Sequence, residues 1–301
     1  MEYSKGFVTL ASGNEKYYKA AANMLKSYRY QNCKSRFGII CDRENEYTKE
    51  FDDVFILNDS KFDYRDKFEL FNICPYERNF FIEPDCLIYN NIDYFWDIFE
   101  GATDVSAFGY NNADLSTWFD NPDIVEEVFG VSRMPIFNPG YFYFERNENT
   151  RKFYNDLIEK SQRFINDERF WGDNKIFVKD KLRDDPVIWL SMKDNNFTCK
   201  ASLESGGCVY LPSVVQIHKI SLRKKELDVQ YKSLINFSDC NILHFSSKRL
   251  TEGCYKNQIV ILKCLTNKRY SCFVPLLETK LMLMLFELFF KGMNRIMKIR
   301  R

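Results

Sequence analysis

Short apolar runs alternate with longer helical patterns along most of the chain. Apolar runs closed by polar or turn residues predict strands at 6–11, 36–41, 53–57 and 79–82, continuing through 87–89 and 92–95, and a strand pair at 104–109 and 140–144. Apolar positions three and four residues apart predict helices at 15–30, 66–74 and 147–164, and another from residue 185. This alternation is typical of βαβ units, so we expect an α/β fold with a mixed, mainly parallel sheet flanked by helices.

The pattern changes near the C-terminus. Residues 1–265 contain no repeat, low-complexity tract or long linker, so we expect one domain there, followed by a tail at 266–301. From Pro275 the tail is strongly apolar, but Glu287 interrupts it too early for a membrane span. The basic residues near its end are Lys291, Arg295, Lys298, Arg300 and Arg301. We expect a C-terminal amphipathic helix that attaches 275–301 peripherally to an anionic membrane, with packing on the domain or in a dimer seam as the alternative.

Composition narrows the function classes. The chain has 43 Lys and Arg against 42 Asp and Glu, and this balance argues against a nucleic-acid partner. None of its ten cysteines has C-x-x-C spacing, so a zinc ribbon or a thioredoxin-type site is not expected. The segment 1–8 carries Glu2 and Lys5 and lacks the apolar core of a signal peptide. We therefore expect a cytoplasmic protein with reduced thiols, located peripherally on the cytosolic membrane face.

Two carboxylates, Glu83 and Asp85, stand where an apolar strand ends. In open α/β sheets, ligands bind beyond the carboxyl ends of the strands, and such acids can hold a divalent cation together with substrate phosphates. The alternative is a turn at Pro84 whose acids only face water. His244 follows an apolar run and is one of only two histidines, so it is either a metal ligand or a hydrogen-bonded buried histidine.

Four segments, in this order, resemble the motifs of GT-A glycosyltransferases, closest to the glycogenin- and lipopolysaccharide-galactosyltransferase-like group. The first runs from Lys67 through Glu83-Pro84-Asp85 to Ile92-Asp93-Tyr94-Phe95, similar to a basic helix, an Asp-x-Asp motif and an "xIDxLF" segment. The later three are 137–144 (Phe-Asn-Pro-Gly-Tyr-Phe-Tyr-Phe), 184–186 (Asp-Asp-Pro) and 244–246 (His-Phe-Ser). The resemblance covers about residues 6–250 and implies the GT-A fold.

The resemblance also implies a set of site residues. The metal ligands, for Mn²⁺ or Mg²⁺, would be Glu83, Asp85 and His244, although the family normally has Asp at the position of Glu83. Residues that would bind the nucleotide sugar, a UDP-sugar above all, are Thr9, Ala11, Asp42, Lys67, Asn138 and Gly140. Asp184 and Asp185 would be the catalytic acids, as base or as stabiliser of the sugar cation. Asp185 before Pro186 is equally a common helix start, with the Asp as N-cap.

Together these features predict a glycosyltransferase. It would move a sugar from a nucleotide-diphosphate donor to a hydroxyl of a glycan or lipid-linked acceptor, in surface-polysaccharide synthesis. The alternative is a catalytically silent GT-A-like protein that binds a sugar nucleotide or acts as a scaffold, because Glu83 departs from the family. A nucleotidyltransferase is disfavoured, since only Ser12-Gly13-Asn14 follows the first strand where a glycine-rich loop would be needed, and no P-loop motif is present.

Overall fold

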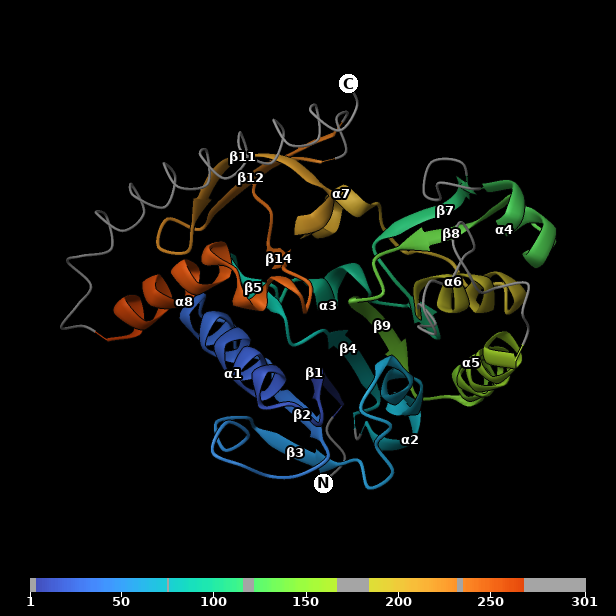
Figure 1. The fold of residues 1–301 in the computed structure, drawn as a ribbon, viewed down its shortest axis with the longest axis horizontal. Helices are drawn as coiled ribbons and strands as arrows, with labels where there is room; N and C mark the ends of the chain where they lie inside the picture. Colours follow the sequence, from blue (N-terminus) through green and yellow to red (C-terminus); the bar gives the residue numbers. More distant parts are fainter. Residues whose placement is uncertain (1–3, 75, 116–121, 167–183, 232–234, 268–301) are drawn as a thin grey trace. The chain divides into compact units, whose positions relative to one another are not determined.

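The computed structural model describes residues 4–74, 76–115, 122–166, 184–231 and 235–267 (Figure 1). The chain divides into two compact units. The first unit contains residues 1–15, 35–83 and 94–206, and the second contains 16–34, 84–93 and 207–301. Each unit is therefore assembled from segments that are far apart in the sequence.

The first unit is built on a six-stranded sheet with the order β3-β2-β1-β4-β9-β6. Its strands are β1 (Lys5–Ala11), β2 (Phe37–Cys41), β3 (Asp53–Ile56), β4 (Arg78–Ile82), β6 (Val105–Ser106) and β9 (Tyr141–Glu145). Strands β3, β2, β1 and β4 are parallel, while β9 runs antiparallel to both β4 and β6. The expected mixed, mainly parallel sheet is confirmed.

Aromatic side chains fill both faces of this sheet. Successive residues of a strand point to opposite faces, so neighbouring Phe80 and Phe81 enter different layers. Phe80 packs against Phe7 (ring centroids 5.7 Å apart) and Phe95 (5.2 Å), whereas Phe81 packs against Phe142 (5.5 Å). Because large side chains are buried on both faces, helices must cover both, as the sequence pattern predicted.

Short and long helices surround this sheet in the first unit. They are the 3₁₀ helix η1 (Tyr64–Glu69), α2 (Leu70–Ile73), α3 (Phe95–Ile98), α4 (Pro122–Phe129), α5 (Glu148–Asn166), α6 (Asp184–Asp194) and α7 (Leu203–Gly206). A hairpin of β7 (Gly109–Asp114) and β8 (Arg133–Phe137) completes the unit. Helices α5 and α6 pack together (Figure 1). Trp189 of α6 donates its indole N–H to the carbonyl of Phe137 at the end of β8 (2.7 Å).

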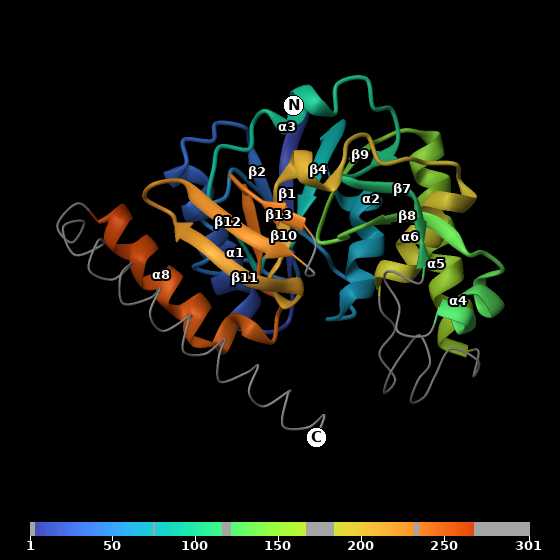
Figure 2. The same cartoon turned by 90° about the horizontal axis from the view of Figure 1, so that it is seen from above.

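The second unit contains two three-stranded sheets. One has the order β10-β14-β5, from β10 (Cys208–Tyr210), β14 (Ile242–His244) and β5 (Cys86–Ile88), with β14 parallel to β10 and antiparallel to β5. The other is an antiparallel meander of β11 (Val214–Ser221), β12 (Glu226–Tyr231) and β13 (Ile235–Phe237) (Figure 2). After β10, the described part of this unit also contains η4 (Leu211–Ser213), η5 (Arg249–Thr251) and α8 (Gly253–Thr266).

Helix α1 (Glu15–Tyr30) has all but its first residue in the second unit. The hydroxyl of its Ser27 accepts a hydrogen bond from the backbone N–H of Ile88 (2.9 Å), which fixes the helix against β5. The hydroxyl of Tyr89, just after β5, donates to the side-chain carbonyl of Gln258 in α8 (2.9 Å). These buried contacts hold β5 between two helices that are distant in the sequence.

One sequence expectation about elements is confirmed in part and another is wrong. The helix expected at 66–74 forms, but its first half, 66–69, belongs to the 3₁₀ helix η1, and only Leu70–Ile73 is α-helical. Asp63 caps the start of η1 by accepting from the N–H of Arg65 (2.9 Å). The strand expected at 92–95 does not form, since Asn91 accepts from the N–H of Asp93 (2.8 Å) in a turn that leads into α3.

The expected tail at 266–301 lies outside the described residues from 268 onward, so its amphipathic helix stays a prediction. Within the part of the chain that the structure describes, no helix combines the length and the apolar character needed to cross a bilayer.

Candidate functional site

A buried lysine joins two acids in the first unit. Lys67 of η1 is only 4% exposed, and its ammonium group lies 2.6 Å from a carboxylate oxygen of Glu83 and also pairs with the carboxylate of Asp184. The ammonium group donates a further hydrogen bond to the carbonyl of Pro139 (3.2 Å). Its nitrogen also lies over the ring of Phe81, 5.5 Å from the ring centroid. Burial alone would lower the pKa of Lys67, but the charges of Asp184 and Glu83 outweigh it and raise that pKa above its ordinary value.

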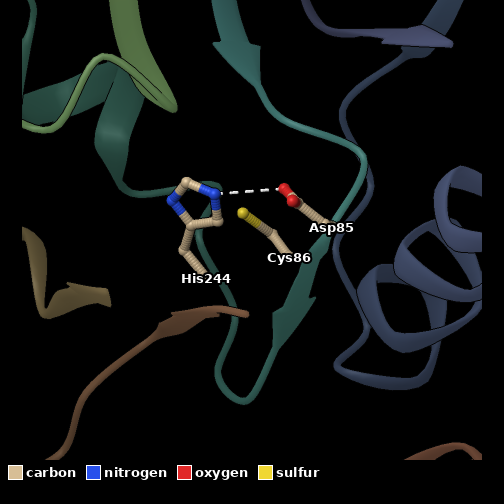
Figure 3. Close-up of side chains that lie close together, drawn as sticks. All are labelled: Asp85, Cys86 and His244. Atoms are coloured by element: carbon tan, nitrogen blue, oxygen red, sulfur yellow. Dashed lines mark ion pairs between the residues drawn. The ribbon is translucent and has the colours of Figure 1, made fainter. Parts of the chain in front are cut away.

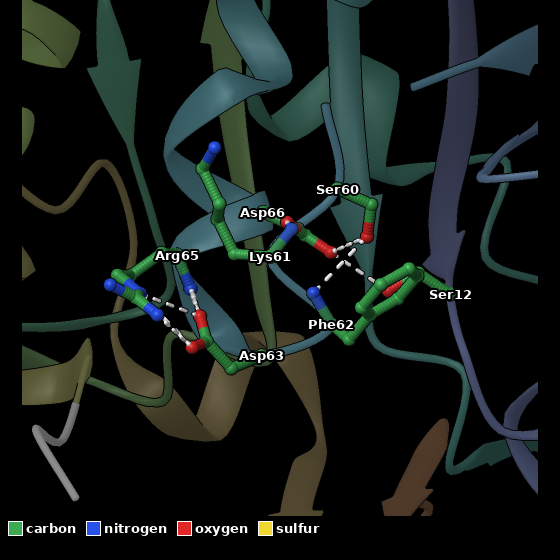
Figure 4. A network of polar contacts seen from close by, with 7 residues as sticks. All are labelled: Ser12, Ser60, Lys61, Phe62, Asp63, Arg65 and Asp66. Carbon is green, nitrogen blue, oxygen red and sulfur yellow. Dashed lines mark hydrogen bonds and ion pairs between the residues drawn. The ribbon is translucent and has the colours of Figure 1, made fainter. Parts of the chain in front are cut away.

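Asp66 positions the helix that carries this lysine. Its carboxylate is buried and accepts hydrogen bonds from the hydroxyls of Ser12 (2.8 Å) and Ser60 (2.6 Å) and from the backbone N–H of Lys61 (2.6 Å). Figure 4 shows the carboxylate of Asp66 directed at the two serine hydroxyls. Because Ser12 directly follows β1, this network ties the start of η1 to the carboxyl end of the central parallel strands.

The turn between β8 and β9 supplies backbone groups to the lysine cluster. Asn138 accepts a hydrogen bond from the backbone N–H of Gly140 (2.8 Å), which closes the turn and leaves the Pro139 carbonyl to accept from Lys67. The Gly140 carbonyl accepts from the N–H of Glu83 (2.7 Å), which extends the pairing of β9 with β4 by one residue. Asn138 and Gly140, both expected to bind the nucleotide sugar, thus lie beside the lysine–carboxylate cluster.

The two expected catalytic acids both fall in the first turn of α6. The described part of this helix runs from Asp184, so Asp185 is inside the helix and is not its N-cap. Asp184 faces Lys67, which brings together residues 117 apart in the sequence. Of the two acids, Asp184 is therefore the one that the fold joins to Lys67 and Glu83.

The expected nucleotide-binding residues lie at or near the ends of β1 and β2. Asp42 directly follows β2, accepts a hydrogen bond from the N–H of Gly13 (2.8 Å) and pairs with Arg43 (2.8 Å). Gly13 has a φ of +68°, a conformation that side chains disfavour, so a glycine suits this turn. Thr9 and Ala11 are buried within β1. A ligand at this edge would contact the loop Ser12–Gly13 and Asp42 before it could reach the buried Thr9 or Ala11.

A second cluster lies in the second unit and consists of Asp85, Cys86 and His244. One atom from each side chain lies within 4.8 Å of the others, and all three residues are buried. The Nε2 atom of His244 is 3.1 Å from the Oδ1 atom of Asp85, and Figure 3 shows the sulfur of Cys86 directed toward the imidazole. The imidazole also packs on the ring of Tyr210 (4.9 Å between centroids).

The donor set of this cluster fits a divalent cation. Although the Asp85 Oδ1 atom lies near His244, the pair lacks hydrogen-bond geometry, so this buried oxygen has no hydrogen-bond donor among the described residues. A buried charged oxygen without a partner is costly, and a cation would supply one. Carboxylate oxygen suits Mg²⁺ and Mn²⁺, and imidazole suits transition metals such as Zn²⁺ and Fe²⁺. Glu83, the third expected ligand, contacts Lys67 in the first unit and does not belong to this cluster, so its role as a ligand stays a prediction.

Sequence reasoning missed two residues of these sites. Cys86 gave no signal in a search for cysteine spacings, because its partner His244 is 158 positions away and meets it only through the pairing of β14 with β5. Asp66 was hidden in a polar stretch, 54 residues from Ser12. Only the strand and loop pairings of the fold reveal them.

Comparisons with known proteins relate this fold to solved structures only. No protein-family model matches the chain, and no curated protein matches its sequence. A crystal structure of the galactosyltransferase LgtC in complex with donor and acceptor sugar analogues is 13% identical, with a TM-score of 0.56 over 87% of this chain and 95% of its own. A crystal structure of an active-site mutant of LgtC is 14% identical, with a TM-score of 0.53 over the same shares.

Sequence identities this low establish a shared fold and nothing finer. The parallel core β3-β2-β1-β4, the antiparallel β9 and the helices around them agree with that likeness. The fold expected from the sequence motifs is therefore confirmed: this protein has the fold of GT-A glycosyltransferases such as the lipopolysaccharide-galactosyltransferase-like group.

Proposed function

We propose that this protein is a glycosyltransferase that moves a sugar from a nucleotide-diphosphate donor, a UDP-sugar, to a hydroxyl of a glycan or lipid-linked acceptor. The observation that carries the proposal is the Asp85–His244 pair in a GT-A fold, with one buried carboxylate oxygen that has no donor among the described residues. Such a pair suits a cation that holds a diphosphate.

Within the first unit, the charges of Lys67, Glu83 and Asp184 suit this cluster to binding a sugar better than to binding a phosphate. Lys67 carries one positive charge and contacts two carboxylates, so its charge is already compensated. A cluster with this balance repels a diphosphate, whereas carboxylate oxygens accept hydrogen bonds from sugar hydroxyls. The side chains of Glu83 and Asp184 keep 25% and 21% of their surface exposed, so neither acid is fully buried away from a bound sugar. Lys67 then acts by orienting the two acids.

The cation would be held by Asp85 and His244. When bound, a divalent cation stabilises the negative charge that develops on a departing diphosphate. The chain's own contribution is to orient the imidazole, which the neighbouring Tyr210 ring and the strand pairing of β14 both restrain. In the first unit, Asp184 is the acid that we assign to the sugar, as base or as stabiliser of its developing positive charge.

A catalytically silent protein that binds a sugar nucleotide is the second candidate. It is favoured by the contact of Glu83 with Lys67, because an acid held there is drawn away from a role as cation ligand. This candidate predicts donor binding without transfer. Turnover therefore distinguishes the two candidates.

The membrane location and the lipid-linked acceptor in this proposal follow from the sequence of the tail. The apolar and basic sequence of 275–301 supports attachment to an anionic membrane surface, and a membrane location on the cytosolic face suits a lipid-linked acceptor in surface-polysaccharide synthesis.

The first experiment is a screen of donors. UDP-, GDP- and CMP-sugars are tested for thermal stabilisation of the protein with and without Mn²⁺, since a ligand specific for the native state raises the melting temperature by mass action. We expect a UDP-sugar to stabilise the protein in the presence of Mn²⁺. If no sugar nucleotide stabilises it under either condition, both candidates are wrong.

The second experiment tests turnover with the same donor. Release of the nucleoside diphosphate, with sugar transferred to an acceptor glycan or to water, is measured for the unchanged protein and for Asp184→Asn. We expect Asp184→Asn to lower kcat by at least about 100-fold, on the scale of general acid–base catalysis. The matched control is Asp194→Asn, at the other end of α6, which should leave kcat unchanged. Donor binding without turnover in the unchanged protein would support the silent candidate.

A further inference from the structure

We propose that Cys86 is a third ligand of the cation site and makes this site select soft or borderline divalent cations, such as Zn²⁺ or Cd²⁺, over Mg²⁺. The proposal deepens the proposed function and rests on it for the identity of the site. It concerns which cation the site prefers, and it departs from the Mn²⁺ or Mg²⁺ site that the sequence motifs imply.

Strand pairing places the thiol. Cys86 and His244 are directly opposite each other in the antiparallel pair β5–β14. Residues that face each other in this way project their side chains to the same side of the sheet, with Cβ atoms about 5 Å apart. The approach of sulfur to imidazole is therefore fixed by the backbone ladder.

Asp85 is held on the same ladder, one residue before β5. Its backbone carbonyl accepts a hydrogen bond from the N–H of Phe245 (2.9 Å), which continues the strand pairing beyond His244. Its carboxylate then reaches the imidazole at 3.1 Å. The three donor atoms come from two short backbone segments that hydrogen bonds hold together, so they are preorganised.

The cluster is buried, and this burial strengthens the case for a bound cation. Asp85 and His244 are each 5% exposed and Cys86 is fully buried. The rings of Tyr210 and Tyr255 lie nearby, and the charge of Asp85 contributes to raising the pKa of Tyr255, after the larger effect of burial. Among the described residues, no lysine or arginine forms an ion pair with Asp85, and the basic partner of its carboxylate is the imidazole of His244.

Ligand chemistry sets the selectivity. Thiolate is a soft ligand that favours Zn²⁺ and disfavours Mg²⁺, which prefers oxygen ligands in octahedral geometry. One carboxylate, one thiolate and one imidazole are three protein ligands, the number found in open zinc sites, where the fourth position is left to water or substrate. The thiol proton leaves on binding, so binding of one cation at Cys86 releases one proton to solvent.

The test uses the full chain and cations with an optical signature of sulfur ligation. Cd²⁺ and Co²⁺ are titrated to equilibrium into the unchanged protein, and the thiolate-to-metal charge-transfer absorption is recorded. The variants are Cys86→Ala and Cys86→Ser, and the matched control is Cys74→Ala, a fully buried thiol outside the cluster. Mn²⁺ affinity is measured in parallel by calorimetry.

We expect one charge-transfer band per protein in the unchanged chain and in Cys74→Ala, and none from this site in either Cys86 variant. Cd²⁺ affinity should fall about 100-fold in the Cys86 variants, since even partners outside the ligand set cost about 10- to 100-fold. Mn²⁺ affinity should change by less than about 3-fold, because manganese gains little from sulfur. A band that survives in both Cys86 variants, or that is absent from the unchanged protein, would overturn the proposal.

Two further arms cover the remaining outcomes. If both Cys86 variants fail to fold, X-ray absorption of the zinc-loaded unchanged protein decides. A sulfur neighbour at about 2.3 Å from the zinc supports the proposal, and a shell of nitrogen and oxygen alone overturns it.

The variant Asp85→Asn distinguishes a failure of the thiol proposal from a failure of the proposed function. Mn²⁺-dependent donor binding that is lost in Asp85→Asn but unaltered in both Cys86 variants, with no charge-transfer band, leaves the proposed function standing and removes the thiol from the site.

Discussion

Replacing Lys67 with methionine tests the cluster that joins β4, η1 and α6. Methionine keeps the length of the side chain and its packing over Phe81, but it removes the charge shared by Glu83 and Asp184. Breaking a buried ion pair by removing one partner costs about 3–5 kcal/mol, because the other charge is left uncompensated. Both acids keep about a quarter or a fifth of their side-chain surface exposed and can be partly rehydrated, so we expect a loss of about 3 kcal/mol.

The assay is urea unfolding followed by circular dichroism, with Lys160→Met as the matched control. Lys160 also contacts two acids, Asp156 and Asp194, but its side chain is 14% exposed and those of its partners are 27% and 43% exposed. Exposed pairs contribute about 1 kcal/mol or less, so the control should lose no more than that. Equal losses in the two variants would refute the assignment of Lys67 as a buried charge that orients two acids.

The pH dependence gives an independent check on the same residue. Burial by itself lowers the pKa of Lys67, but Asp184 and Glu83 raise it above its ordinary value in the folded state. A group whose folded pKa is raised contributes stability that is complete below its unfolded pKa, about 10.4 for lysine, and is lost as the pH rises through the folded pKa. The stability difference between the unchanged protein and Lys67→Met should therefore be constant from about pH 7 to 9. A difference that shrinks over this range would mean that the lysine is not held by the two acids.

Two further predictions concern parts of the chain that the lysine does not reach. Asp66→Ala should cost about 3 kcal/mol in urea unfolding, because two hydroxyls and one backbone N–H lose a charged acceptor that is itself buried. Asp63→Ala, whose side chain is one-third exposed, should cost about 1 kcal/mol, and equal costs would contradict the positioning role of Asp66. A chain ending at Val274 should lose co-sedimentation with anionic vesicles and keep activity on a water-soluble acceptor, and equal pelleting of both forms would show that 275–301 does not bind membranes.

Local sequence patterns predicted much of the fold because they encode its strands and helices directly. The run at 6–11 became β1, the periodic segment at 15–30 became α1, and the expected pair at 104–109 and 140–144 became the β6–β9 contact, although β6 is shorter than expected. These elements are specified by burial of alternate or periodic apolar residues, which are visible in a short window. The meander β11–β13 was not predicted.

The contacts that make the candidate site depend on the fold and could not be predicted from short windows. The motif order placed Asp85 and His244 together, but the register of β14 on β5 was needed to add Cys86. In the same way, the helix at 184 was expected, yet only the folded chain shows which of its two acids meets Lys67. A one-residue change in strand register or helix start exchanges the side chains that face each other, and such changes leave the apolar pattern almost unaltered.

The family motif normally has Asp where this chain has Glu83, and the structure gives this difference a physical interpretation. Glu83 belongs to the lysine cluster, and Asp85, two residues later, belongs to the cluster with Cys86 and His244. In the sequence, Glu83 and Asp85 look like two ligands of one cation, yet the folded chain pairs Glu83 with a buried lysine and leaves Asp85 beside a thiol and an imidazole. A glutamate that left Lys67 to bind a cation would forgo a buried ion pair and leave the lysine with one acid instead of two. The hard oxygen ligands of the cation site are then reduced to Asp85, and the neighbouring residue Cys86 becomes decisive for which metal is bound. The substitution that weakens the match to the sugar-transferase motif is the same one that gives the thiol its chemical importance.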